Sequence, residues 1–213
     1  MNRDQQSGLK DRFIFLGNDL VLDFVNTRPL QNGELIELVP DFRALLRWFQ
    51  AANLLSSGEA AKLQGKWAES SRARHAVEGL QELREKLRKQ VLAWEHGSAV
   101  QHSTVDELNR LMAQHPMRTR LTTRGGAPAM ELWFEPHTPE DLLAPLAHGA
   151  ARLFADVDRS RVRKCENCVG HFYDNSKKGN RRWCSMQLCG NRLKVAAYAA
   201  RKRRERAVAQ RVH

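Results

Sequence analysis

The stretch CENCVGHFYDNSKKGNRRWCSMQLCGNR, residues 165–192, decides the fold of the C-terminal part of this chain. It contains all four cysteines, arranged as Cys165-x2-Cys168 and, fifteen residues later, Cys184-x4-Cys189. Two residues between thiolates allow a tight turn to aim both sulfurs at one point, and four thiolates complete the tetrahedral shell of a structural zinc site. The spacing therefore predicts one structural Zn²⁺ bound by these four cysteines.

The second cysteine pair has a geometric constraint of its own. Residues five apart on an α-helix differ by about 140° in azimuth, so both thiolates cannot face one metal ion from a single helix. We therefore expect Cys184 to precede a helix, Ser185 to cap it, and Cys189 to lie in or near its first turn.

Other uses of the four cysteines stay open at this point. Disulfide bonds are rare in a chain that begins without an apolar signal segment. The same thiols can serve as a redox switch or hold an iron–sulfur cluster. A catalytic zinc site keeps one position open to water, which here requires His171 to replace a cysteine.

Charge divides the chain at the same place as the cysteines. Residues 159–213 hold 16 Lys and Arg against 3 Asp and Glu, whereas residues 1–158 hold 19 against 21. We therefore expect a nearly neutral N-terminal domain over residues 1–158, able to fold alone, and a basic zinc module over residues 159–213.

Composition limits the class of protein. With 42% hydrophobic and 28% charged residues, the chain resembles an ordinary globular protein. No stretch approaches the roughly 18 apolar residues of a membrane helix, and the opening MNRDQQSGLKDR lacks a signal core. We therefore expect no membrane partner and a cytoplasmic, nucleoid-associated location.

Hydrophobic periodicity predicts a mostly helical N-terminal domain. The segments with helical spacing or helix-entry signals are 42–52, 56–67, 70–95, 104–115 and 138–157. The expected buried stripe of the longest one is Ala73, Val77, Leu80, Leu83 (or Leu87), Val91 and Trp94. Thr104 and Glu107 match a capping box at the start of the fourth.

A change of period predicts strands between the last two helices. Residues 117–123 and 129–134 are rich in Thr and aromatic residues and flank a Gly-Gly turn. The predicted fold class is thus α+β: a predominantly helical N-terminal domain with a small β-hairpin, then a four-cysteine zinc finger leading into a basic C-terminal helix.

One polar cluster in the N-terminal domain suits a ligand. Asp23, Asn26 and Thr27 lie close together in an apolar segment. They either bond their own backbone at a turn or line a pocket for a small-molecule effector. Phosphate-binding glycine loops and the His-Glu-x-x-His and Gly-x-Ser-x-Gly motifs are absent from the sequence. We therefore expect no catalytic residues, and a domain that senses an effector or mediates homodimerisation.

Several residues around the cysteines resemble a known family. The sequence Cys189-Gly-Asn-Arg192, with Phe172, Asp174, Ser176 and the Arg-Arg-Trp before Cys184, is similar to the CGNR zinc-finger family, named after that tetrapeptide. Leu22-Asp-Phe-Val-Asn-Thr27 resembles the opening of the ABATE domain that usually precedes this finger. The two matches cover nearly the whole chain. They imply a bacterial stress-induced transcription regulator with a zinc-dependent DNA-binding end.

The basic residues point to DNA independently of that resemblance. Cations around a zinc-anchored helix are typical of phosphate binding, and Asn and Arg side chains suit adenine and guanine edges. The residues expected to contact double-stranded DNA are Lys177, Lys178, Arg181, Arg182, Asn191, Arg192, Lys194, Arg201, Arg203 and Arg204.

Two other functions remain in competition with DNA binding. The first is an RNA- or ribosome-associated zinc protein, although Phe172, Tyr173 and Trp183 give little surface for stacking single-stranded bases. The second is a small-molecule enzyme domain with a nucleic-acid-targeting finger, which needs titratable residues converging in a pocket.

Overall fold

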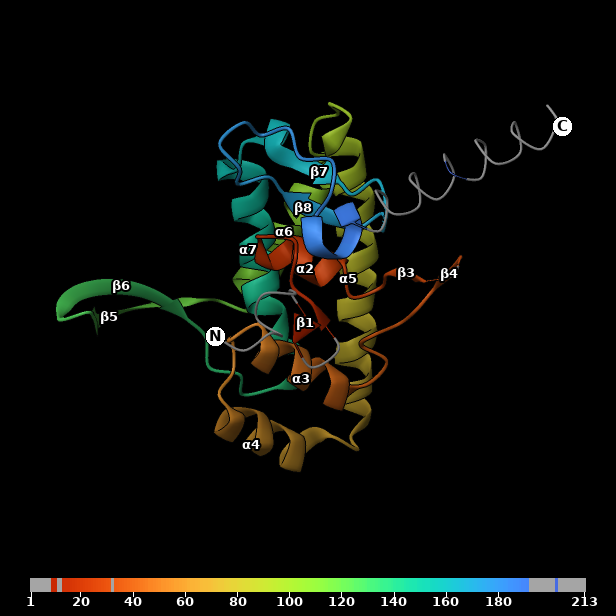
Figure 1. Ribbon diagram of the computed structural model, residues 1–213. Coiled ribbons are helices and arrows are strands. Elements are labelled where there is room, and N and C mark those ends of the chain that lie inside the picture. Colours follow the sequence, from red (N-terminus) through yellow and green to blue (C-terminus); the bar gives the residue numbers. More distant parts are fainter. Residues whose placement is uncertain (1–8, 11–12, 32, 192–201, 203–213) are drawn as a thin grey trace, which may run out of the picture.

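The computed structural model describes residues 9–10, 13–31, 33–191 and 202, and Figure 1 shows how its elements are arranged. The α-helices are α2 (Leu20–Val25), α3 (Phe42–Ala51), α4 (Ser57–Trp67), α5 (Ser71–Glu95), α6 (His102–Gln114) and α7 (Leu143–Asp156). Shorter helical turns are η1 (Pro139–Leu142), η2 (Arg159–Arg161) and η3 (Met186–Gly190). In the described part of the chain, no helix has the length and apolar character needed to cross a bilayer.

The strands form four separate antiparallel pairs. These are β1 (Leu9–Lys10) with β2 (Phe13–Ile14), β3 (Leu30–Gln31) with β4 (Glu34–Leu35), β5 (Arg118–Arg124) with β6 (Ala127–Trp133), and β7 (Val162–Lys164) with β8 (His171–Tyr173). The described residues therefore form a helical body with small hairpins, and the predicted fold class is confirmed for them. The predicted basic C-terminal helix lies outside the described residues.

The helical core is built around the short helix α2, which packs against both α5 and α7 (Figure 1). Asp19 caps it by accepting hydrogen bonds from the backbone N–H groups of Val21 and Leu22. Val21, Leu22, Phe24 and Val25 are at most 1% exposed, and the ring of Phe24 lies 5.3 Å from that of Trp48 on α3. This short segment is stable as a helix here because α5 and α7 pack against it and cover most of its apolar side chains.

The long helix α5 carries the predicted apolar stripe, and the prediction is confirmed at every position, Leu83 and Leu87 both included. Two polar residues on the same helix are buried as well, Arg84 at 2% and Gln90 at 4% exposure. Arg84 donates to both oxygens of Glu37 and to the hydroxyl of Thr27. This network ties α5 to the segment that follows α2, because a buried guanidinium requires partners for its charge.

The start of α6 differs from the prediction. The helix begins at His102 with Gln101 as its N-cap residue, so the capping box at Thr104 and Glu107 was wrong. Gln90 is the physical reason: its Oε1 accepts from the Gln101 N–H and from the Thr104 hydroxyl. A buried amide from α5 thus takes the place of a local cap.

The β5–β6 hairpin extends away from the body, as Figure 1 shows. Leu121 and Met130 face each other across it and are 76% and 79% exposed. Gly125 and Gly126 form the turn with positive φ values of 59° and 83°. Two strands and a Gly-Gly turn were predicted at this place.

Candidate metal centre and nucleic-acid interface

The first cysteine pair lies in a tight turn at the end of β7. The N–H of Cys165 donates to the carbonyl of Gly170 at 2.8 Å, and the N–H of Val169 donates back to the carbonyl of Cys165 at 3.1 Å. Val169 adopts a left-handed φ of 54°, which is strained for a β-branched residue. The turn places backbone N–H groups of Cys168 and Gly170 against the cysteine sulfurs, where they stabilise thiolates.

The second pair is arranged as the helical geometry predicts. Cys184 precedes a helical turn, Ser185 caps it by accepting from the Leu188 N–H, and Cys189 lies within it. The turn is a π-turn: the Gly190 N–H donates to the Ser185 carbonyl five residues back, at 2.9 Å. This wide turn brings the sulfurs of Cys184 and Cys189 to 3.6 Å from one another.

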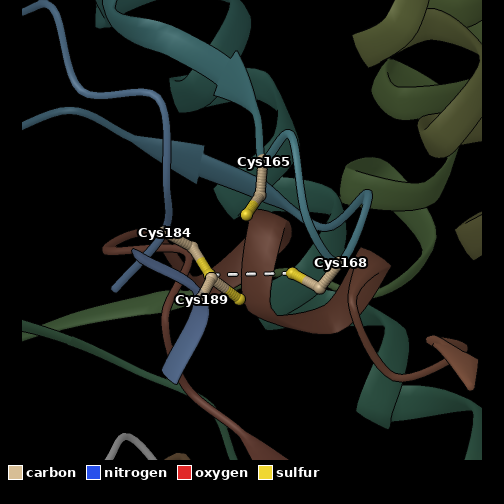
Figure 2. A group of neighbouring side chains, drawn as sticks. All are labelled: Cys165, Cys168, Cys184 and Cys189. Atoms are coloured by element: carbon tan, nitrogen blue, oxygen red, sulfur yellow. Dashed lines mark hydrogen bonds between the residues drawn. The ribbon is translucent and has the colours of Figure 1, made fainter. Parts of the chain in front are cut away.

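All four cysteine sulfurs converge, as Figure 2 shows, and lie within 4.8 Å of one another. The Cys168 and Cys184 sulfurs are 3.7 Å apart. A tetrahedral zinc ion with Zn–S bonds of about 2.3 Å sets sulfurs about 3.8 Å apart, so the group fits one Zn²⁺ in a closed structural shell. The four cysteines are free thiols rather than disulfides.

Proton sharing among the thiols shows why a cation suits this place. Hydrogen bonds from Cys168 and Cys184 lower the pKa of Cys165, while the bond to Cys165 raises the pKa of Cys168 to about 12. The pKa of Cys184 is raised by the same interaction. Sharing among these three sulfurs thus favours a single thiolate, whereas a bound dication stabilises the thiolate form of its cysteine ligands.

His171 does not belong to this group of sulfurs. Its Nδ1 lies 2.8 Å from Oε1 of Glu95, the last residue of α5, and both side chains are buried. The alternative of a catalytic zinc with His171 as ligand therefore has no support in the arrangement.

Two family models match the chain in sequence order. The ABATE model, described as "Putative stress-induced transcription regulator", matches residues 18–157, which is more than half of the chain. The chain belongs to the ABATE family. The CGNR zinc finger model matches residues 161–202, so both resemblances seen in the sequence are confirmed. None of the curated proteins searched matches the chain.

Within this family member, the ABATE part (residues 18–157) and the CGNR finger (residues 161–202) are in direct contact. The carbonyl of Gly17, just before the ABATE part, accepts from the Tyr173 N–H at 2.7 Å, and Asn18 Nδ2 donates to the Tyr173 carbonyl. Val162 of β7 lies 4% exposed in the same apolar core as α2. The outer edge of β8 is therefore bonded to the segment around α2 rather than to water.

The three residues of the predicted ligand pocket take part in this packing. Asp23 accepts from the Gly17 N–H at 2.7 Å, Asn26 bonds the backbone of His171, and Thr27 donates to the Phe24 carbonyl. Their hydrogen bonds are made within the protein, and Asn26 also lines an apolar cavity. A ligand at these residues remains a prediction.

The predicted DNA contacts lie partly on the loop between the cysteine pairs. Lys177, Lys178 and Arg182 are exposed there, and Arg181 is half-buried with its guanidinium 5.2 Å from the centre of the Phe172 ring. Asn191 is exposed at the end of η3. Arg192, Lys194, Arg201, Arg203 and Arg204 lie outside the described residues.

The loop is held by a residue to which sequence reasoning gave no role. Asp174, fully buried, accepts from the backbone N–H groups of Ser176 and Arg181. Arg161 donates from the other side to the carbonyls of Asp174 and Ser176. The Asp-x-Ser spacing, typical of an Asx turn, was the signal in the sequence that could have found it.

Proposed function

We propose that this ABATE-family protein is a DNA-binding transcription regulator whose CGNR finger contacts duplex DNA. The observation that carries the proposal is the exposed Lys177 and Lys178 on a loop fixed between the two halves of the metal centre. Rigid presentation of cations is what phosphate contacts need, and most hydrogen bonds in protein–DNA complexes go to the backbone.

Selection from a random duplex library tests this function. Zinc-loaded protein is expected to enrich a defined sequence, and a chelator is expected to abolish the enrichment. A parallel selection from a random RNA pool tests the alternative that the protein binds RNA. Enrichment of RNA alone, or no enrichment from either pool, contradicts the proposal.

Arg192 is proposed to read a base and Arg203 a phosphate. Arg192 lies three residues after Cys189 in the sequence, next to the metal ligands. The sequence predicts a helix for the basic run that contains Arg203, and side chains at successive positions of a helix point in different directions. Arg192→Ala is expected to reduce discrimination between target and random duplex by about 1–3 kcal/mol with zinc retained. Arg203→Ala is expected to weaken binding to the target duplex and to the random duplex equally. Equal losses for Arg192→Ala indicate a phosphate contact instead, and lost zinc indicates a structural role.

The ABATE part is proposed to report a stress signal to the finger, through an effector or by homodimerisation. An apolar cavity lined by Leu30 and Leu35 of the β3–β4 hairpin, and by Cys168 and Val169 of the finger, gives an effector a location that touches both parts. A fragment screen read by shifts of the finger's NMR signals, with sedimentation for the oligomeric state, tests both routes.

The proposed location is the cytoplasm, on the nucleoid. Cell fractionation before and after nuclease treatment tests it: the protein is expected to move from the DNA-bound to the soluble fraction. Recovery with the membrane fraction contradicts it.

A further inference from the structure

Beside the metal centre, an open groove of about 650 Å³ runs between the end of α5 and the finger. Five cations line it against two carboxylates. The cations are Arg159, Arg163, Lys164, Arg181 and Arg182, and the carboxylates are Glu95 and Glu166. Arg159 lies between the two family matches and was not among the expected DNA contacts.

Both carboxylates of the groove are already paired. Glu95 is 7% exposed and bonds His171. Glu166 accepts two hydrogen bonds from Arg182, at 2.6 and 2.5 Å. Neither group is therefore free to neutralise the other cations.

The other arginines of the groove donate to backbone carbonyls rather than to acids. Arg159 donates to the Gly97 carbonyl at 3.1 Å, and Arg163 donates to the Gly179 carbonyl at 2.8 Å. Within the described part of the chain, Arg159, Arg163 and Lys164 have no carboxylate within ion-pair distance. Carbonyl contacts orient a guanidinium and leave its full charge to attract an anion.

The groove is built by both parts of the protein. Gly97 follows α5 of the ABATE part, whereas Lys164 and Arg182 lie one and two residues before Cys165 and Cys184. Metal binding therefore fixes the backbone on the finger side of the groove, and α5 fixes the other side.

We propose that this groove binds the phosphodiester backbone of duplex DNA, so that the ABATE part forms one side of the DNA interface. The inference rests on the proposed function and adds Arg159 and Lys164 to it as phosphate contacts. Each phosphate contact releases counterions, so each adds to the salt dependence of binding.

The test compares two double variants of the full, zinc-loaded chain. Arg159→Ala with Lys164→Ala removes two groove cations. Arg118→Ala with Arg124→Ala removes two exposed cations from the β5–β6 hairpin and lowers the net charge equally. The affinity for one duplex is measured over a range of salt concentrations, and zinc content and thermal midpoint are measured for each protein.

The slope of log affinity against log salt is expected to fall by about 0.9 for each groove cation removed, and to stay unchanged in the hairpin variant. An unchanged slope in the groove variant, with the unmodified protein binding DNA normally, overturns the inference and leaves the proposed function intact. Equal falls in both variants also overturn it, because the effect is then one of net charge. No duplex binding by the unmodified protein overturns both proposals.

Discussion

Asn26 and His171, 145 residues apart in the sequence, exchange two hydrogen bonds. The Asn26 amide donates to the His171 carbonyl and accepts from the His171 N–H, both at 2.8 Å. A side-chain amide thus pairs with β8 as a neighbouring strand would. These two buried hydrogen bonds, made by uncharged groups, join the ABATE part to the finger.

Asn26→Ala is expected to destabilise the whole protein. It leaves a buried N–H and a buried carbonyl of His171 without partners, at a cost of about 1–3 kcal/mol for each unsatisfied group. Chemical denaturation measures the free energy of unfolding. Asn180→Ala, which truncates an exposed amide in the finger loop, serves as the control and is expected to change little. Equal effects of the two variants contradict the expected role of Asn26.

One zinc ion per chain is expected from elemental analysis of the purified protein. Cys184→Ser is expected to lower the zinc content and unfold the finger, because zinc binding to such modules contributes on the order of 10 kcal/mol to folding. Gln187→Ala, an exposed change in the same turn, is the control and should keep its metal. Full zinc content in the Cys184 variant contradicts the assignment of the ligands.

Cutting the chain after Asp158 tests whether the ABATE part folds alone. The boundary in charge and cysteines predicts that it does. The contacts across that boundary predict a cost, because removal of Val162 opens the core and removal of His171 takes away the partner of the Glu95 carboxylate. We expect a helical but less stable fragment in thermal unfolding followed by circular dichroism. A midpoint equal to that of the full chain shows that the contacts contribute little.

Arg84→Ala is expected to lower the free energy of unfolding by about 1–3 kcal/mol, because it leaves partly buried acceptors without their donor. The change removes the partner of Glu37 and a donor to Thr27. Arg74→Ala on the exposed face of the same helix is the matched control, with an expected effect within about 0.5 kcal/mol. Similar unfolding free energies for the two variants rule out the network as a source of stability.

The sequence predicts the metal centre well because its constraints are local. Two residues between Cys165 and Cys168 define one turn, and the α-helical repeat alone excludes Cys184 and Cys189 from one helix face. Arg84 was not predicted to be buried, because its partners Glu37 and Thr27 lie 47 and 57 residues away. The Thr104 cap was wrong for the same reason, since Gln90 on another helix supplies the competing acceptor.

At the candidate DNA interface, too, the sequence predicts local features but not those that depend on distant residues. Lys177 and Lys178 were recognised by their charge and by their place between the cysteine pairs. Arg159 was overlooked because its importance comes from Gly97, 62 residues earlier, which forms the opposite side of the groove. The sequence shows where the cations are, but only the folded structure shows which of them have no carboxylate nearby.

The Gly125–Gly126 turn of the β5–β6 hairpin is a suitable site for inserting a peptide tag. A Cβ atom at either glycine meets nothing within 4 Å, and the turn extends into solvent away from the metal centre (Figure 1). An epitope or a small fluorescent tag inserted there leaves both chain ends, the finger and the helical core unaltered. The hairpin thus offers a place for a tag with which the protein can be followed in living cells.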